Sequence, residues 1–309
     1  MRITNNMIIS NMIKNLSNNQ TRLSKYMDQL DTGKKIVVPS DDPVVAARAL
    51  KLRTDVSKVE QYQKNIKDAQ SWLEASDIAM GKIVDVLQKA RELTNQASNG
   101  TNSPEETKAI AMEMEQLKLQ VIQTANSTYA GRYMFSGFKT DQPLIQGDES
   151  KPDYGEFLID VDTNVEKIRY EIGVGDNISI NVAGGDLFNN GVNAANNSKP
   201  TMIQMFDDVI AHMNAGETDL TSSHLADFDR ELGNVLKARA DTGAKQNRAD
   251  LTADRMSKDL VNFTDLMSKN EDVDVAETIM NLKNEENVYQ ASLAGGARII
   301  QQTLVDFLR

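Results

Sequence analysis

The sequence predicts a mainly α-helical protein. Its N- and C-terminal halves should form a long antiparallel coiled-coil rod, with a small antiparallel β domain inserted at the tip. Three observations support this fold class. Apolar residues recur at steps of three and four through both halves, which keeps one face of a helix turned toward a partner. Aromatic residues make up only 5% of the chain, which argues against a large rounded core. Between the halves, residues 138–200 change to strand-like alternation with Gly-Asp turns.

Both chain ends carry an apolar seam that a lone helix cannot bury. The sequence predicts a first helix over residues 1–33 and a last helix after Asp274. The N-terminal seam consists of Ile9, Ile13, Leu16, Leu23, Met27 and Leu30. The C-terminal seam consists of Ile279, Leu282, Tyr289, Leu293, Ile300 and Phe307. The residues that interrupt them are Gln20, Glu286, Gly296 and Thr303. These terminal seams should face each other and then neighbouring subunits, so they are the candidate assembly interface.

The longest helix is predicted between about Val44 and Ser98. Its apolar seam consists of Val59, Tyr62, Ile66, Ala69, Leu73, Ser76, Met80, Ile83, Leu87, Ala90, Thr94 and Ala97. Three–four spacing over this length is typical of a coiled-coil strut. Asp42 is expected to cap the start of this helix, with Pro43 in its first turn.

Two further caps mark the starts of other helices. Ser103, with Glu106 three residues later, predicts a capping box for a helix that folds back antiparallel on the long one. Asp274 and Glu277 form a similar capping pair for the last helix. Between the helix that starts after Ser103 and the last helix, the sequence predicts two more helices. One begins at about residue 202, and the other covers about 223–267.

The segment between the helical halves reads as a β insert. Three stretches alternate apolar and polar residues or are rich in strand formers: Phe157–Val161, Val165–Ile172 and Asn177–Val182. Glycine and aspartate lie between them, so a small antiparallel unit is predicted. Gly173-Val174-Gly175 lacks the third glycine of a dinucleotide site and is interpreted as a turn.

Composition excludes several kinds of function. The net charge of −11 disfavours nucleic acid as a ligand, because phosphate binding needs clustered cations. The chain has no cysteine, and His212 and His224 lack a partner at metal-binding spacing, so no metal or other cofactor is expected. No segment reaches the roughly 20 apolar residues of a membrane span, and the N-terminus does not read as a cleaved signal peptide. No nucleophile–base pair points to catalytic residues.

Several motifs resemble those of bacterial flagellins and their hook-associated relatives. The terminal ones are Gly33-Lys34-Lys35-Ile36, Pro39-Ser40-Asp41-Asp42-Pro43, the segment 271–277 and Tyr289-Gln290-Ala291-Ser292-Leu293. Others are more similar to the junction-protein branch than to flagellin proper: Ala125-Asn126, the segment 131–137, Arg239 to Gly243, and Asn247-Arg248. The resemblance covers both helical arms, whereas the β insert resembles nothing closely.

The resemblance implies a structural flagellar subunit and no enzyme. Such a subunit joins the hook to the filament and assembles through its terminal helices into a ring. The implied partners are further copies of itself, the hook-side junction protein, flagellin, and an export chaperone that binds the C-terminal helix. The implied location is the extracellular flagellum, reached by type III export without a cleaved signal peptide.

The implied domain organisation follows the chain outward and back. Residues 1–40 and 271–309 should form the inner assembly domain, residues 41–137 and 201–270 the helical rod, and residues 138–200 the outer β domain. Two other functions stay open at this point. A flagellin filament subunit would polymerise by itself into long filaments, and a helical enzyme of the lyase type would show turnover.

Overall fold

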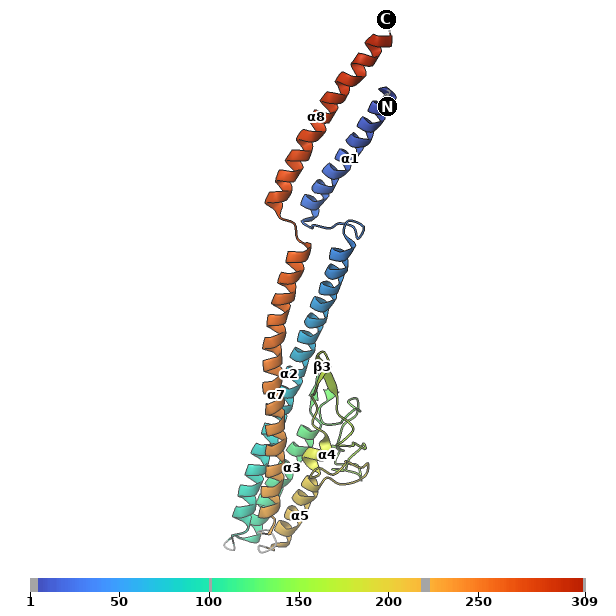
Figure 1. The fold of residues 1–309 in the computed structure, drawn as a ribbon. Coiled ribbons are helices and arrows are strands. Elements are labelled where there is room, and N and C mark those ends of the chain that lie inside the picture. Colours follow the sequence, from blue (N-terminus) through green and yellow to red (C-terminus); the bar gives the residue numbers. More distant parts are fainter. Residues whose placement is uncertain (1–4, 100–101, 218–222, 308–309) are drawn as a thin grey trace. The chain divides into compact units, whose positions relative to one another are not determined.

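The structure is a computed structural model that describes residues 5–99, 102–217 and 223–307 (Figure 1). It divides into two compact units. One contains residues 1–59 and 258–309, and the other contains residues 60–257. We call them the terminal unit and the central unit and describe each by itself. Long helices dominate both, which confirms the mainly α-helical fold class.

The terminal unit pairs two helices from opposite ends of the chain. Helix α1 covers Asn5–Thr32 and helix α8 covers Val275–Phe307. The two pack against each other along their lengths (Figure 1). α1 is followed by Gly33, whose φ of 66° lies in the left-handed region that glycine adopts without strain. The first and last helices predicted from the terminal seams are therefore confirmed.

Two longer helices contribute to both units. α2 covers Pro43–Ala97 and α7 covers Leu225–Glu271. Within the central unit they run antiparallel, because Asp77 of α2 accepts two hydrogen bonds from Arg239 of α7, at 2.9 and 3.0 Å. Further toward the C-terminal end of α2, Arg91 forms an ion pair with Asp229. The seam predicted on α2 is the buried face: from Ile66 to Ala97 every seam residue is at most 1% exposed.

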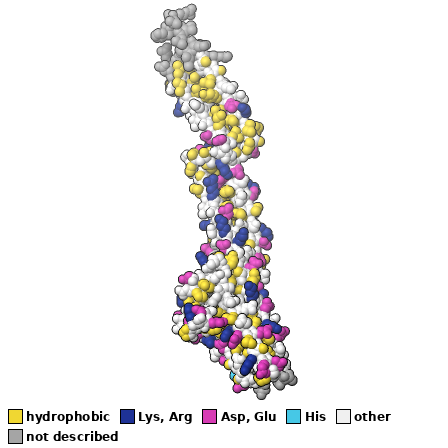
Figure 2. Space-filling view, turned by 180° about the vertical axis from the view of Figure 1, so that it is seen from behind, with side chains coloured by type: hydrophobic (Ala, Val, Ile, Leu, Met, Phe, Trp, Pro, Cys, Tyr) yellow, Lys and Arg dark blue, Asp and Glu magenta, His cyan; other side chains and the backbone are white. Residues whose placement is uncertain are grey.

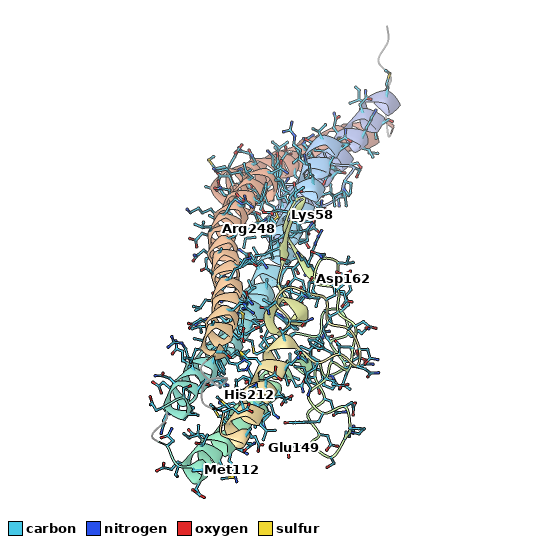
Figure 3. All side chains as sticks on the ribbon, turned by 90° about the horizontal axis from the view of Figure 1, so that it is seen from below. Lys58, Met112, Glu149, Asp162, His212 and Arg248 are labelled. Carbon is cyan, nitrogen blue, oxygen red and sulfur yellow. The ribbon has the colours of Figure 1, made fainter. Side chains whose placement is uncertain are left out.

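Two shorter helices complete the helical part of the central unit. α3 covers Pro104–Ala125 and packs against α5, which covers Thr201–Ala215. The predicted capping box is present at the start of α3: the Ser103 side chain accepts from the Glu106 amide, and the Glu106 carboxylate accepts from the Ser103 amide. Figure 3 labels Met112 on α3 and His212 on α5.

The insert between α3 and α5 contains small antiparallel sheets, as predicted. β1 (Thr128–Tyr129) pairs with β2 (Arg132–Tyr133), and β3 (Arg169–Gly173) pairs with β4 (Asp176–Ser179). The β3–β4 ladder places Tyr170 opposite Ile178, and a bulge lies between Glu171 and Gly173. The expected strand at 157–161 is not formed. Its ends instead make isolated bridges, from Phe157 to Ile145 and from Val161 to Ala194.

Aromatic side chains concentrate in the core of this insert. Phe135, Phe157 and Phe188 are fully buried, and the rings of Phe135 and Phe188 meet edge to face with centroids 5.9 Å apart. Phe188 belongs to α4 (Gly184–Phe188), a short helix that the sequence did not predict. Three of the five fully buried phenylalanines thus lie in the insert, and the other two, Phe206 and Phe228, lie on α5 and α7.

The insert lies against the helices of the central unit. Asn65 of α2 donates to the carbonyl oxygen of Glu171 in β3, at 2.8 Å. On the other side, Arg248 of α7 (labelled in Figure 3) pairs with Asp176 of β4. The sequence predicts the insert at the tip of the rod, whereas these contacts place the β3–β4 hairpin alongside α2 and α7.

Candidate assembly surface on the paired terminal helices

Helices α1 and α8 pair antiparallel through a mixture of small, polar and apolar contacts. Met12 near the start of α1 lies against Gly296 near the end of α8. Further along, the Asn19 side-chain amide donates to the Ser292 hydroxyl at 3.2 Å. Next, the Arg22 guanidinium donates to Glu285 at 2.9 Å. Positions advance on α1 while they recede on α8, which defines the antiparallel register.

The predicted assembly residues divide into two groups by exposure. Four keep large exposed apolar surfaces: Ile13 (58%), Met27 (50%), Ile279 (46%) and Leu293 (46%). The half-buried ones are Ile9, Leu16, Leu23, Leu30, Leu282 and Tyr289. The side chains of Ile300 and Phe307 lie outside the described residues. Figure 2 shows exposed apolar side chains gathered over this part of the chain. The pairing of α1 with α8 thus covers the terminal seams only in part.

Several buried residues of α1 and α8 were not predicted. Asn19, Gln29 and Thr278 are at most 8% exposed although they are polar. Gly296, which the sequence showed only as an interruption of the seam, is also buried. A Cβ at this position would clash with the end of the Met12 side chain. The missing side chain at Gly296 is a feature of the sequence that could have indicated this contact.

A polar clamp joins the two connectors of the terminal unit, residues 33–42 and 272–274. Lys34 and Asp272 form an antiparallel bridge, and the Val273 amide donates to the Gly33 carbonyl oxygen at 3.1 Å. The Lys35 amide donates to the carbonyl oxygen of Glu271 at 2.6 Å. The side-chain amide of Gln29 donates to the Lys35 carbonyl oxygen at 2.7 Å. Backbone segments more than 200 residues apart in sequence are therefore held in a single register.

Buried and half-exposed charges strengthen this clamp. The Glu271 carboxylate, whose side chain is 6% exposed, accepts two hydrogen bonds from Arg53, at 2.8 and 2.6 Å. Lys34 lies 3.5 Å from Glu271 and 2.6 Å from Asp272. The hydrogen bonds from Arg53, assisted by the nearby Lys34, hold the pKa of Glu271 below its ordinary value. The hydrogen bond from Lys34, and a second one from Ser268, lower the pKa of Asp272 in the same way.

Two of the predicted helix caps lie next to this clamp. Asp42 Oδ1 accepts from the amides of Val44 and Val45 at the start of α2, at 3.0 and 3.2 Å. Asp274 Oδ1 accepts from the amides of Ala276 and Glu277 at the start of α8, at 2.9 and 3.1 Å. Both carboxylates thus bind amides that have no partner within the helix, close to where the chain leaves the connectors.

The described residues form no candidate metal centre. Over residues 5–99, 102–217 and 223–307, no three histidine, cysteine, aspartate or glutamate side chains are grouped so that they could hold a metal ion. His212 and His224 stack with ring centroids 5.4 Å apart, and each Nδ1 contacts a carboxylate. None of the helices in the described part of the chain is long and apolar enough to cross a membrane.

Two family profiles match this chain. Residues 3–140 match the bacterial flagellin N-terminal helical region, and residues 225–308 match the bacterial flagellin C-terminal helical region. Together the profiles cover more than two thirds of the chain and leave out most of the insert.

Individual relatives span nearly the whole chain. Flagellar hook-associated protein 3 of Escherichia coli K12 is 26% identical over 94% of this chain and 95% of its own. A flagellin of Bacillus subtilis 168 is 28% identical over 98% and 97%, respectively. The crystal structure of flagellar hook-associated protein 3 from Legionella pneumophila superposes with a TM-score of 0.60 over 71% of this chain and 97% of that one. That structure is 17% identical in sequence, so the likeness concerns the fold.

Proposed function

We propose that this chain, which belongs to the bacterial flagellin family, is a structural subunit that joins the flagellar hook to the flagellin filament. The observation that carries the proposal is the incomplete burial of the terminal seams. Ile13, Met27, Ile279 and Leu293 remain between 46% and 58% exposed after α1 and α8 have paired. Full burial of an aliphatic side chain contributes about 1.5–3 kcal/mol relative to exposure, so contact with neighbouring subunits would be favourable at every one of these positions.

The polar clamp supports the same role. An assembly interface needs helices that are presented in a fixed register, because one misplaced turn would move the apolar residues off the contact. The bridge between Lys34 and Asp272 joins the connector after α1 to the one before α8. The bidentate Arg53–Glu271 pair joins α2 to the end of α7. We infer that this clamp sets the register in which the terminal helices meet their neighbours.

A junction subunit is favoured over a filament subunit by the motif at residues 131–137. In the structure this motif begins at the β1–β2 turn and continues into the insert core, where Phe135 is fully buried. The full-length likeness to hook-associated protein 3 of E. coli supports the same assignment. The partners would be further copies of the chain in a ring, the hook-side junction protein and flagellin.

The remaining parts of the proposal rest on the family. The chain would leave the cytoplasm through the flagellar type III export channel without cleavage, and an export chaperone would bind its C-terminal helix. It would function in the extracellular flagellum and would catalyse no reaction.

Deletion of the gene tests this function directly. Cells without the protein should export flagellin into the medium as monomer, because flagellin has no junction on which to assemble, and a plasmid copy should restore filaments. Normal filaments on the deletion cells would contradict the proposal.

A flagellin filament subunit is the second candidate, since the B. subtilis flagellin is similar over almost the entire chain. Long filaments formed by the purified protein alone would decide for it. A junction subunit should instead remain monomeric, or form short oligomers, under the same conditions.

A further inference from the structure

A charged groove lies within the central unit, where the insert meets α7. Its volume is about 290 Å³. Lys167 and Asp186 line it from the insert, and Lys237, Asp241 and Lys245 line it from α7. The three α7 residues follow one another at intervals of four, so they share one face of the helix.

Some of these charges are paired and others are not. Lys245 forms an ion pair with Asp241 of its own helix, at 2.7 Å. Among the described residues, no carboxylate lies within 4.0 Å of Lys167 or Lys237, and no cation lies within that distance of Asp186. Two ammonium groups and one carboxylate therefore line the groove without a direct partner.

Lys167, Lys237 and Asp186 line the same groove. Burial raises the pKa of the Asp186 carboxyl, and the positive charges of Lys167, Lys245 and Lys237 oppose that rise. Lys167 lies on the same wall of the groove as Asp186, whereas Lys237 and Lys245 lie on the α7 wall. A group inserted between them could meet Asp186 and a lysine simultaneously.

The net charge of the groove indicates the charge that a ligand should carry. Three lysines and two aspartates give the groove a net charge of +1, although the whole chain carries −11. We propose that the groove binds a free acidic amino acid, such as glutamate or aspartate. Its two carboxylates would meet ammonium groups of the two walls, and its own ammonium group would meet Asp186. The net charge of −1 on this ligand would neutralise the site.

The lining disfavours other ligand classes. No aromatic residue lines the groove, so it offers no surface on which a nucleobase or another flat ring could stack. A divalent cation would be repelled by the three lysines. A neutral amino acid would leave one lysine unpaired, and a simple dicarboxylate would place a negative charge beside Asp186.

A bound acidic amino acid would connect two elements that are distant in sequence. Lys167 and Asp186 belong to the insert, whereas Lys237 and Lys245 belong to α7. The nearby contact from Asn234 of α7 to Asn190 already joins these elements at one end of the groove. Ligand binding should therefore stabilise the insert on the rod and raise its melting temperature.

Calorimetric titration of the full-length monomer with L-glutamate, L-glutamine and glutarate tests the proposal. Each ligand is added as a sodium salt at matched ionic strength, because exposed charges are screened by salt. Glutamate should bind with an affinity of about the millimolar range, and the other two should bind about tenfold more weakly. Melting temperatures under the same conditions give an independent measurement.

Two variants assign the roles of the groove residues. Asp186→Asn should weaken glutamate about tenfold while leaving or improving glutarate, because only glutamate presents an ammonium group to Asp186. Lys237→Gln, on the face of α7 that lines the groove, should weaken both ligands. Lys108→Gln on α3 is the matched control, because Lys108 is exposed and lies outside the groove; it should change neither.

The outcomes separate this proposal from the proposed junction function, since binding is measured on the monomer. Glutarate binding as tightly as glutamate, or unchanged glutamate affinity in both groove variants, would overturn it. The absence of saturable heat and of any melting shift would do the same. Should Asp186→Asn fail to fold, the Lys237→Gln comparison alone still decides.

Discussion

The two adjacent glycines of α8 provide a sharp test of the α1–α8 register. A Cβ added at Gly295 would meet no atom within 4 Å, whereas one added at Gly296 would lie 2.9 Å from Met12 Sδ and closer still to Met12 Cε. Glycine costs a helix interior about 0.8–1 kcal/mol relative to alanine. Gly295→Ala should therefore stabilise the paired helices by about 1 kcal/mol.

Gly296→Ala gains the same propensity but displaces Met12. Overpacking of a contact costs about 1–3 kcal/mol, and the flexible end of a methionine places this case toward the lower limit. The net effect should lie between neutral and about 2 kcal/mol destabilising. In a Met12→Ala background the clash is gone, so Gly296→Ala should then stabilise as Gly295→Ala does. The difference between the two backgrounds measures the coupling of the two positions.

Hydrogen exchange of α8 amides on both sides of residue 295 is the appropriate assay, because the terminal helices are expected to open without unfolding of the central unit. A change of 1 kcal/mol alters the exchange rate about fivefold. Gly295→Ala should slow exchange by that factor, and Gly296→Ala should leave it unchanged or accelerate it. Equal slowing of exchange by both substitutions in the wild-type background would refute the reasoning, since Met12 would then not lie against Gly296.

Three further predictions concern assembly, pH and the insert. Leu293→Asp should change the free energy of unfolding of the monomer by no more than about 0.5 kcal/mol and yet abolish filament formation in cells. Leu73→Asp, at a fully buried site, should instead lower the melting temperature of the monomer itself, because it buries an unpaired charge. Arg53→Met should destabilise the terminal unit by about 1 kcal/mol at neutral pH, a modest figure because the arginine is half exposed. The pKa of Glu271 is lower in the native state than in the unfolded state, where it is about 4.3. The pair therefore stabilises the protein above about pH 4.3, and this stabilisation is lost as the pH falls through the native pKa. The free energies of unfolding of wild type and variant, measured by chemical denaturation, should converge in acid, and a difference that stays constant with pH would contradict the pairing. Gly185→Ala would place a Cβ against the carbonyl oxygen of Val192, in the loop after α4. The clash should loosen the insert, so limited proteolysis should cleave the insert faster while the helical circular-dichroism signal persists.

The sequence by itself determined the long helices and the starts of three of them. The starts of α2, α3 and α8 follow from Asp42, Ser103 and Asp274, because a side chain that accepts hydrogen bonds from amides within three residues is a local device. The buried face of α2 follows equally from the three–four spacing of its apolar residues. Local spacing and short-range hydrogen bonds require no knowledge of the rest of the fold.

The insert shows where this local information ends. The alternation at residues 157–161 correctly indicated burial, since Phe157, Ile159 and Val161 are at most 4% exposed. Alternation states which side of an extended segment is apolar, but a strand also needs a neighbour in register. At this segment the neighbours are Ile145 and Ala194, which offer only single bridges. The β1–β2 pair and α4 were missed because each is too short for a period to be read.

At the chain ends the tertiary structure decided which residues meet. The seam pattern identified α1 and α8 as partners, but it favoured apolar residues. It therefore missed Asn19 and Gly296, which the antiparallel register buries. The clamp between Lys34 and Asp272 joins residues separated by 238 positions. Nothing near either residue specifies the other, because an ion pair depends on distance in space and carries no period along the chain. The sequence set the helices and their faces, and only the packing of opposite chain ends set the contacts between them.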